Sequence, residues 1–165
     1  MSVPEPAFDE LYREVVVDHY RRPRNRGEVA DATHRLEGVN PVCGDAVELD
    51  LKLVGDVLAE MAFRGQGCAI SQASTSMMTE RLKGRSLAEA GGVLSQVRAM
   101  LVEGAEPNER GLGDLAALQG VAKLPVRVKC AMLGWNVLEK GLGIHDSRFT
   151  IHDSGPGGSN EEAIP

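Results

Sequence analysis

The sequence predicts an α+β fold in which a small antiparallel sheet of about three strands packs against five or six helices. One observation is that residues 47–53 and 57–63 both alternate between apolar and other side chains, on either side of a Gly55-Asp56 turn. A period of two that is interrupted by a tight turn is typical of a β-hairpin. The other is that apolar residues beyond Cys68 recur mostly at helical spacing. Strands followed by a run of helices indicate the α+β class.

The elements at the start of the chain follow from the same two periods. A first helix is predicted from residue 8 toward Pro23, and a short strand near residues 34–39. The first hairpin strand is expected to have one buried and one solvated face. The residues expected to be buried are Val47, Leu49, Leu51 and Leu53, and those expected in water are Glu48, Asp50 and Lys52.

Helices account for most of the chain after the hairpin. One is predicted over residues 68–83, a short one over residues 115–122, and a long last one that follows Pro125 and reaches residue 142. A polar stretch over residues 103–113 contains a proline and three glycines, and is expected to be a surface connection.

The segment after the first of these helices carries its own start signal. Ser86 resembles a helix cap, and Glu89 three residues later completes a capping box. Gly91 and Gly92 are expected to interrupt the chain before a further helix over residues 93–101, because glycine is a poor helix former.

A single domain is predicted over residues 8–142. Residues 1–7 contain two prolines and are expected to be a loose lead-in, and residues 143–165 a flexible polar tail. A chain of 165 residues is long enough to bury a real core without disulfides.

The composition excludes several classes of protein. The net charge of −6 argues against a nucleic-acid surface, which needs a concentrated basic face. No stretch is apolar for long enough to span a membrane, and the N-terminus lacks the build of a signal peptide. We therefore expect a cytoplasmic protein with no membrane and no nucleic-acid partner. The basic stretch over residues 21–26 has two interpretations, a solvated helix end or a docking patch for an acidic partner.

The three cysteines indicate a metal site. Cys43, Cys68 and Cys130 are unevenly spaced, and an odd number of cysteines in a reducing compartment favours metal or thiol chemistry over disulfides. Asp45 stands two residues after the first. Three thiolates and a carboxylate complete a tetrahedral set for zinc or iron. The competing interpretations are inert buried cysteines and a surface aspartate.

The surroundings of the cysteines favour thiolates. Cys68 and Cys130 are both expected in the first turn of a helix, where backbone N–H groups and the helix dipole stabilise an anion. Arg127 and Lys129 are expected to offset the negative charge of the set, with surface placement as the alternative. Because a carboxylate is an exchangeable ligand for a thiolate-rich centre, the set indicates a working site rather than a structural one.

Five strings of the sequence resemble the IscU/NifU-N-like family. They are residues 41–45 (PVCGD), 67–71 (GCAIS) and 127–131 (RVKCA), together with 18–20 (DHY) and 23–25 (PRN). The resemblance covers about residues 8–142. Two features resemble the SufU branch of the family: a lysine rather than a histidine directly before the last cysteine, and a longer stretch between the second and third cysteines.

The resemblance implies a function and a set of roles. It implies a zinc protein that accepts persulfide sulfur from a SufS-type cysteine desulfurase for iron–sulfur cluster assembly, as a co-substrate or activator, with downstream Suf scaffold proteins as further partners. Zinc would be held by Cys43, Asp45, Cys68 and Cys130, and Cys43 would accept the sulfur. Two alternatives remain: a scaffold on which a [2Fe–2S] cluster is built by the same residues, and a domain whose zinc only stabilises the fold. None of the four histidines is expected to bind the zinc, namely His19, His34, His145 and His152.

Overall fold

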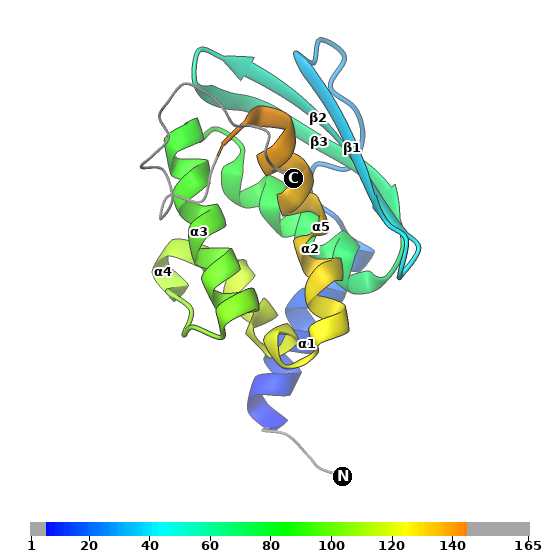
Figure 1. Ribbon diagram of the computed structural model, residues 1–165, viewed down its shortest axis with the longest axis vertical. Helices are drawn as coiled ribbons and strands as arrows, with labels where there is room; N and C mark the ends of the chain where they lie inside the picture. Colours follow the sequence, from blue (N-terminus) through cyan, green and yellow to red (C-terminus); the bar gives the residue numbers. More distant parts are fainter. Residues whose placement is uncertain (1–5, 145–165) are drawn as a thin grey trace.

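A computed structural model describes residues 6–144, with side chains from residue 14 onward, and confirms the α+β fold (Figure 1). The elements are α1 (Pro6–Arg21), β1 (His34–Asn40), β2 (Asp45–Val54), β3 (Val57–Gln66), α2 (Ala69–Leu82), α3 (Leu87–Glu103), α4 (Glu109–Leu112), the 3-10 helix η1 (Gly113–Lys123) and α5 (Pro125–Leu142). Most of the predicted lead-in and tail lies outside the described residues. None of the described helices has the length and apolar character needed to cross a membrane.

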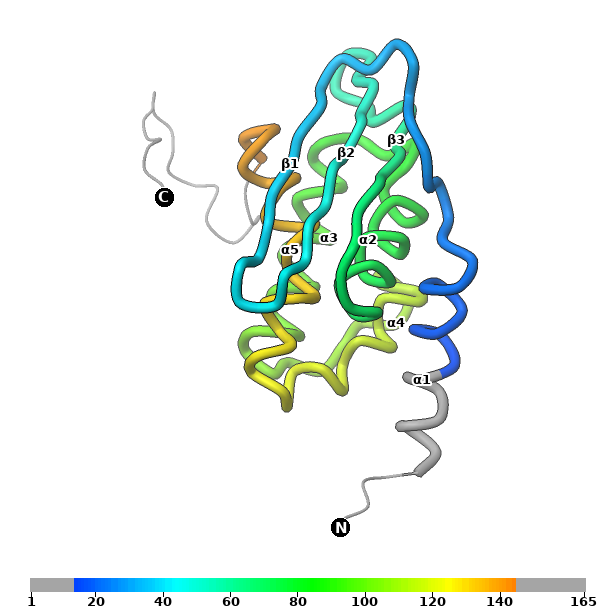
Figure 2. Tube along the Cα trace, turned by 90° about the vertical axis from the view of Figure 1, so that its right-hand side faces the viewer, coloured from blue at the N-terminus to red at the C-terminus, as the bar shows by residue number. Residues whose placement is uncertain are grey.

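The three strands form one antiparallel sheet in the order β1-β2-β3. Helices α2 and α5 pack against one face of this sheet, as Figure 2 shows, and α3 packs mainly against η1, α4 and α5. The predicted hairpin is β2 and β3, in which Leu49 pairs with Phe63. The alternating residues Val47, Leu49 and Leu51 are fully buried under the helices, so this face of the hairpin forms the core as expected.

The other face of the hairpin is not simply solvated, because Asp50 is fully buried there. Its carboxylate accepts hydrogen bonds from Arg35 (2.6 Å), from Arg64 (3.2 Å) and from the backbone N–H of Val29 (3.0 Å). Burial alone raises the pKa of a carboxyl group, but here the bonds from Arg64 and the Val29 N–H outweigh it and lower the pKa of Asp50. The expectation that Asp50 faces water was wrong, because alternation cannot show that arginines cover a carboxylate.

Small side chains let α5 approach α2 closely. The hydroxyl of Ser74 donates to the carbonyl oxygen of Ala131 (2.7 Å) and accepts from the Trp135 indole N–H (3.2 Å). Gly134 faces Thr75 at such short range that a Cβ there would lie 2.6 Å from the Thr75 Oγ1. This close packing holds the start of α5 near the start of α2, where the cysteines lie.

Helix α3 begins at the predicted capping box. The Glu89 N–H donates to the Ser86 hydroxyl (3.1 Å), and the Glu89 carboxylate accepts from the Ser86 N–H (2.9 Å). The helix then continues through Gly91 and Gly92, so the predicted interruption was wrong. Two glycines cost a helix only about 2 kcal/mol. The capping box and the buried side chains of this helix offset that cost, namely Ala90, Leu94, Val97, Met100 and Leu101.

The basic stretch after α1 is largely engaged within the chain. Arg22 and Arg24 both hydrogen-bond to Asp18, and these bonds lower the pKa of Asp18 to about 2. The Arg26 guanidinium lies over the Phe63 ring, 5.8 Å from its centre. These contacts tie the helix end and the following loop to the fold. They favour this interpretation of the basic stretch and argue against a docking patch.

Candidate metal centre

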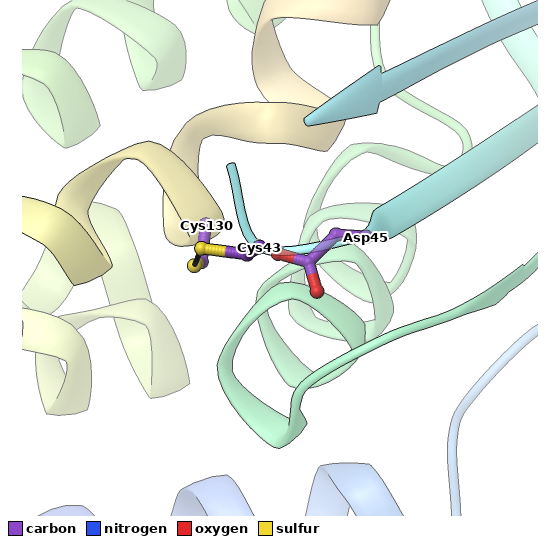
Figure 3. A group of neighbouring side chains, drawn as sticks. All are labelled: Cys43, Asp45 and Cys130. Carbon is purple, nitrogen blue, oxygen red and sulfur yellow. Dashed lines mark hydrogen bonds between the residues drawn. The ribbon is translucent and has the colours of Figure 1, made fainter. Parts of the chain in front are cut away.

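Three separate segments of the chain, residues 43–45, Cys68 and Cys130, bring the four predicted ligands to one end of the sheet. Cys43 lies in the loop between β1 and β2, Asp45 is the first residue of β2, Cys68 precedes α2, and Cys130 lies in α5. The ligand atoms of Cys43, Asp45 and Cys130 all lie within 4.8 Å of one another. Figure 3 shows these three side chains gathered between α5 and the start of β2, with the Cys43 and Cys130 sulfurs in contact at 3.1 Å.

The Cys43 loop is shaped by Asn40. The Asn40 carbonyl oxygen accepts from the backbone N–H groups of Cys43 (3.2 Å) and Gly44 (2.8 Å), and its side-chain oxygen accepts from the Val42 N–H (3.2 Å). Gly44 has a φ of +73°, which favours glycine. Cys43 is half-buried and Val42 is largely exposed, so the first sulfur is borne by a surface loop. The role of Asn40 was not predicted, although an asparagine before a proline is a turn signal.

Asp45 connects the sheet to the start of α2. Its Oδ1 accepts from the Cys68 backbone N–H (2.8 Å), and its Oδ2 lies 3.8 Å from the Cys68 sulfur. Gly67 packs directly on this carboxylate, so that a Cβ at Gly67 would collide with Asp45. Its φ of +137° also disfavours any residue other than glycine. Asp45 is only 1% exposed, which excludes the alternative of a surface aspartate.

Cys68 is the N-cap of α2. Its sulfur accepts from the Ser71 backbone N–H (3.4 Å), so the helix start stabilises negative charge on this sulfur, as expected.

Cys130 lies one turn deeper in its helix than predicted. It is the sixth residue of α5, and its sulfur is 3.9 Å from the Val126 carbonyl oxygen. The expectation of a first-turn position was wrong because α5 begins at Pro125, so free N–H groups do not favour a thiolate here. Burial, and then the neighbouring side chains of Cys43, Asp45 and Cys68, raise the pKa of the fully buried Cys130 thiol. Cys130 therefore needs a cation beside it to lose its proton.

Arg127 and Lys129 have different surroundings. Arg127 interacts with the Cys130, Cys68 and Cys43 side chains, and these interactions raise the pKa of Arg127. Lys129 lines a groove between β1 and α5 together with Val39 and Pro41. Arg127 is thus the cation that the structure brings to the sulfurs.

The donor types suit a tetrahedral zinc ion, and three of the four lie together. Cys68 falls outside the group formed by Cys43, Asp45 and Cys130 and adjoins it through Asp45. Three sulfurs and one carboxylate oxygen are ligands that zinc accepts, and the buried Cys130 thiol requires the charge that such an ion supplies. With zinc–sulfur bonds of about 2.3 Å, tetrahedral sulfurs are about 3.8 Å apart. The Cys43–Cys130 contact of 3.1 Å would open by roughly 0.7 Å to admit the ion, a small movement for a loop residue.

The histidines lie apart from these contacts as far as the structure describes them. Nδ1 of the buried His19 lies 2.8 Å from the Ser76 hydroxyl, and Nε2 lies 2.9 Å from an Asp114 oxygen and 3.5 Å from a Glu80 oxygen. His34 bonds to Thr33. His145 and His152 lie outside the described residues.

Comparison with known proteins shows the family of the chain and agrees with the fold. The family model described as "NifU-like N terminal domain" matches residues 11–150. The chain is 45% identical over 136 residues to the "Zinc-dependent sulfurtransferase SufU" of Bacillus subtilis, covering 82% of this chain and 91% of that one. It is 41% identical over 136 residues to the "Iron-sulfur cluster assembly scaffold protein IscU" of Streptococcus pyogenes, with 82% and 84% covered. A crystal structure from Fervidobacterium islandicum, described as an iron–sulfur cluster assembly scaffold for the SUF system, superposes with a TM-score of 0.75. That protein is 36% identical, and the match covers 81% of this chain and 97% of the other.

Proposed function

Because the chain belongs to the family of NifU-like N-terminal domains, as the resemblance of its cysteine strings predicted, we propose that it is a zinc-dependent sulfur carrier. In this proposal Cys43 accepts sulfur from the persulfide of a SufS-type cysteine desulfurase. The sulfur then passes toward iron–sulfur cluster assembly on a downstream Suf scaffold, in the cytoplasm. The observation that carries the proposal is the convergence of Cys43, Asp45 and Cys130, with Cys68 bound to Asp45, at one end of the sheet.

The three proposed sulfur ligands differ in how easily each can leave the metal. Cys68 is fixed at a helix cap and Cys130 is buried within α5, whereas Cys43 is carried by a surface loop. Zinc, when bound, would keep Cys43 as a thiolate at neutral pH while damping its reactivity. Cys43 is therefore the sulfur that can swing outward without disturbing a helix or a strand.

The transfer step is a thiol–disulfide exchange. The Cys43 thiolate attacks the outer sulfur of the desulfurase persulfide, and the bond between that sulfur and the desulfurase cysteine breaks. Cys43 then bears the persulfide, and the desulfurase cysteine leaves as a thiolate. Arg127, beside the three sulfurs, balances the negative charge that gathers during this step.

The surroundings of the site suit a protein partner. Val42, Leu124 and Val126 are exposed apolar side chains that adjoin Cys43 and the start of α5. Exposed apolar residues around a reactive group are typical of a docking surface, because a partner covers them and excludes water. In this proposal the desulfurase covers these three side chains.

A [2Fe–2S] scaffold is the second candidate. It is favoured by the identity of 41% to the Streptococcus pyogenes scaffold and by the sulfur-rich donor set, which suits iron–sulfur clusters as well as zinc. The metal content of the purified protein separates the two. Colourless, tightly held zinc supports transfer, and a brown cluster that moves to apo-acceptors supports the scaffold.

The decisive experiment adds the zinc-loaded protein to a cognate desulfurase and follows alanine production. We expect alanine production to rise, and mass spectrometry to find the transferred sulfur on Cys43. Cys43→Ser is expected to abolish both, so full stimulation by this variant would remove Cys43 from the role. If chelation of zinc unfolds the protein and the desulfurase never responds, the zinc serves only the fold.

A further inference from the structure

The sulfurs of Cys43 and Cys130 are closer than two metal ligands need to be. They lie 3.1 Å apart, although the residues are separated by 87 positions in the sequence. Reacting atoms in a near-attack arrangement are about 3–3.5 Å apart. This contact therefore suits direct chemistry between the two sulfurs.

We propose that Cys130 is the resolving cysteine for sulfur carried on Cys43. Cys130 passes its proton to the outer sulfur of the Cys43 persulfide anion and attacks Cys43 Sγ, which forms a Cys43–Cys130 disulfide and releases the outer sulfur as hydrosulfide. The inference rests on the proposed function, in which Cys43 carries the persulfide, and it supplies the step by which the sulfur leaves.

The step balances without an external oxidant. One sulfur–sulfur bond forms between Cys43 and Cys130, and the bond between Cys43 and its outer sulfur breaks. That outer sulfur takes the electron pair and is reduced to hydrosulfide, while the two cysteines are oxidised to a disulfide. A dithiol reductant must then reduce the disulfide before the next cycle. The reaction that follows this step is thus a thiol–disulfide exchange with another protein or a small dithiol.

The positions of the two sulfurs suit the direction of this attack. Cys130 is fully buried in α5, whereas Cys43 is half-buried on the loop beside it. Attack on a sulfur expels the group on its far side. A buried attacker behind an exposed persulfide therefore sends hydrosulfide toward solvent and away from the core. The Arg127 guanidinium, which interacts electrostatically with Cys130, attracts the negative charge shared by the attacking and leaving sulfurs.

The contacts of Cys68 do not suit the role of resolving cysteine. Its sulfur accepts the Ser71 N–H and lies 3.8 Å from the Asp45 carboxylate, whose other oxygen accepts the Cys68 backbone N–H. These contacts fix the Cys68 side chain at the helix cap. We therefore assign the resolving role to Cys130, and Cys68 serves as the matched control because it is a ligand of the same proposed centre.

The test uses the full chain as purified, under anaerobic conditions, with its metal content measured. Sodium polysulfide loads the persulfide, excess reagent is removed, and released hydrosulfide is followed while the products are mapped by peptide mass spectrometry. The wild type is expected to release one hydrosulfide for each Cys43–Cys130 disulfide. Cys130→Ser is expected to retain the added sulfur on Cys43 and to release it at least about tenfold more slowly. Cys68→Ser is expected to form the Cys43–Cys130 disulfide.

Two results would overturn the assignment. One is release from Cys130→Ser as fast as from the wild type, and the other is a wild-type disulfide that pairs Cys43 with Cys68. Circular dichroism checks the fold of each variant, and the mapping of the wild-type disulfide decides the question even if Cys130→Ser fails to fold. Polysulfide replaces the desulfurase in this test. If the protein releases hydrosulfide after loading with polysulfide but never accepts sulfur from a desulfurase, only the proposed function is refuted.

Discussion

The Asp45 carboxylate holds Cys68 by two contacts, a hydrogen bond of 2.8 Å to its backbone N–H and an approach of 3.8 Å to its sulfur. Asp45 thus joins the first residue of β2 to the start of α2, and it also offers an oxygen to the proposed metal. A single side chain therefore contributes both to the fold and to the site, and two substitutions can separate the contributions.

Asp45→Ala should lose both contributions, whereas Asp45→Asn should keep an acceptor for the Cys68 N–H and lose only the negative charge. We expect Asp45→Ala to lower the free energy of unfolding of the metal-free protein by about 1–2 kcal/mol, and Asp45→Asn to lower it less. Both variants should bind zinc more weakly, because a neutral amide is a poorer ligand than a carboxylate. Urea unfolding and competition with a chromophoric chelator measure the two effects. Equal zinc affinity in the wild type and both variants would show that Asp45 is not a ligand.

Gly67→Ala should damage the site through geometry alone. Its φ of +137° disfavours any residue with a Cβ, and a Cβ would collide with the Asp45 carboxylate. We expect a loss of at least about 2 kcal/mol in the free energy of unfolding, together with weaker zinc binding. The control is Gly92→Ala, because Gly92 lies within α3 and no atom comes within 4 Å of an added Cβ. This substitution should stabilise the protein by about 0.5–1 kcal/mol and leave zinc binding unchanged.

Asp50→Asn should change how stability depends on pH. The pKa of Asp50 is lowered in the folded state from its ordinary value of 3.8, so its contribution to stability is full above that value. The contribution is lost as the pH falls through the folded pKa. The variant should be less stable at neutral pH by about 2 kcal/mol, because Arg35 and Arg64 lose their buried partner. Its deficit should shrink as the pH falls below about 3.8, because the unfolded chain takes up a proton at Asp50 before the folded protein does.

Urea unfolding from neutral pH down to about pH 3 measures the deficit. Asp31→Asn is the control, since Asp31 forms an exposed pair with Lys52 and should contribute little. A deficit that stays constant down to pH 3 would contradict the role assigned to Asp50.

Val126→Asp should weaken docking of the desulfurase. Val126 is 61% exposed and lies one turn before Cys130, where the proposed partner surface excludes water. A buried, unpaired charge there should raise the concentration of this protein needed for half-maximal activation roughly tenfold. Val54→Asp is matched to it, because Val54 is 57% exposed but ends β2 at the hairpin turn. Similar activation curves for the two variants would place the docking surface elsewhere.

The sequence carries clear signals for the features that depend on local patterns. Alternation around the Gly55-Asp56 turn predicted the hairpin, and Ser86 with Glu89 predicted the capping box. The proposed ligands are far apart in the sequence, so no local pattern connects them. Their prediction depended on the donor types, three cysteines and an aspartate, and on the resemblance of the strings around them to a known family.

The features that were missed depend on contacts between distant segments. The burial of Asp50 requires Arg35, Arg64 and the segment at Val29 to meet over one side chain. The continuity of α3 through two glycines requires the packing of its buried face, which outweighs helix propensity. Single-sequence periodicity contains none of this information.

The placement of Cys130 in the last helix also orders events during synthesis. Cys43 and Asp45 leave the ribosome early, but their partner sulfur follows 87 residues after Cys43. A nascent chain that ends before α5 therefore lacks one ligand of the proposed set, however long it waits. The complete set of proposed ligands therefore becomes available only once α5, which also completes the buried core, has been made.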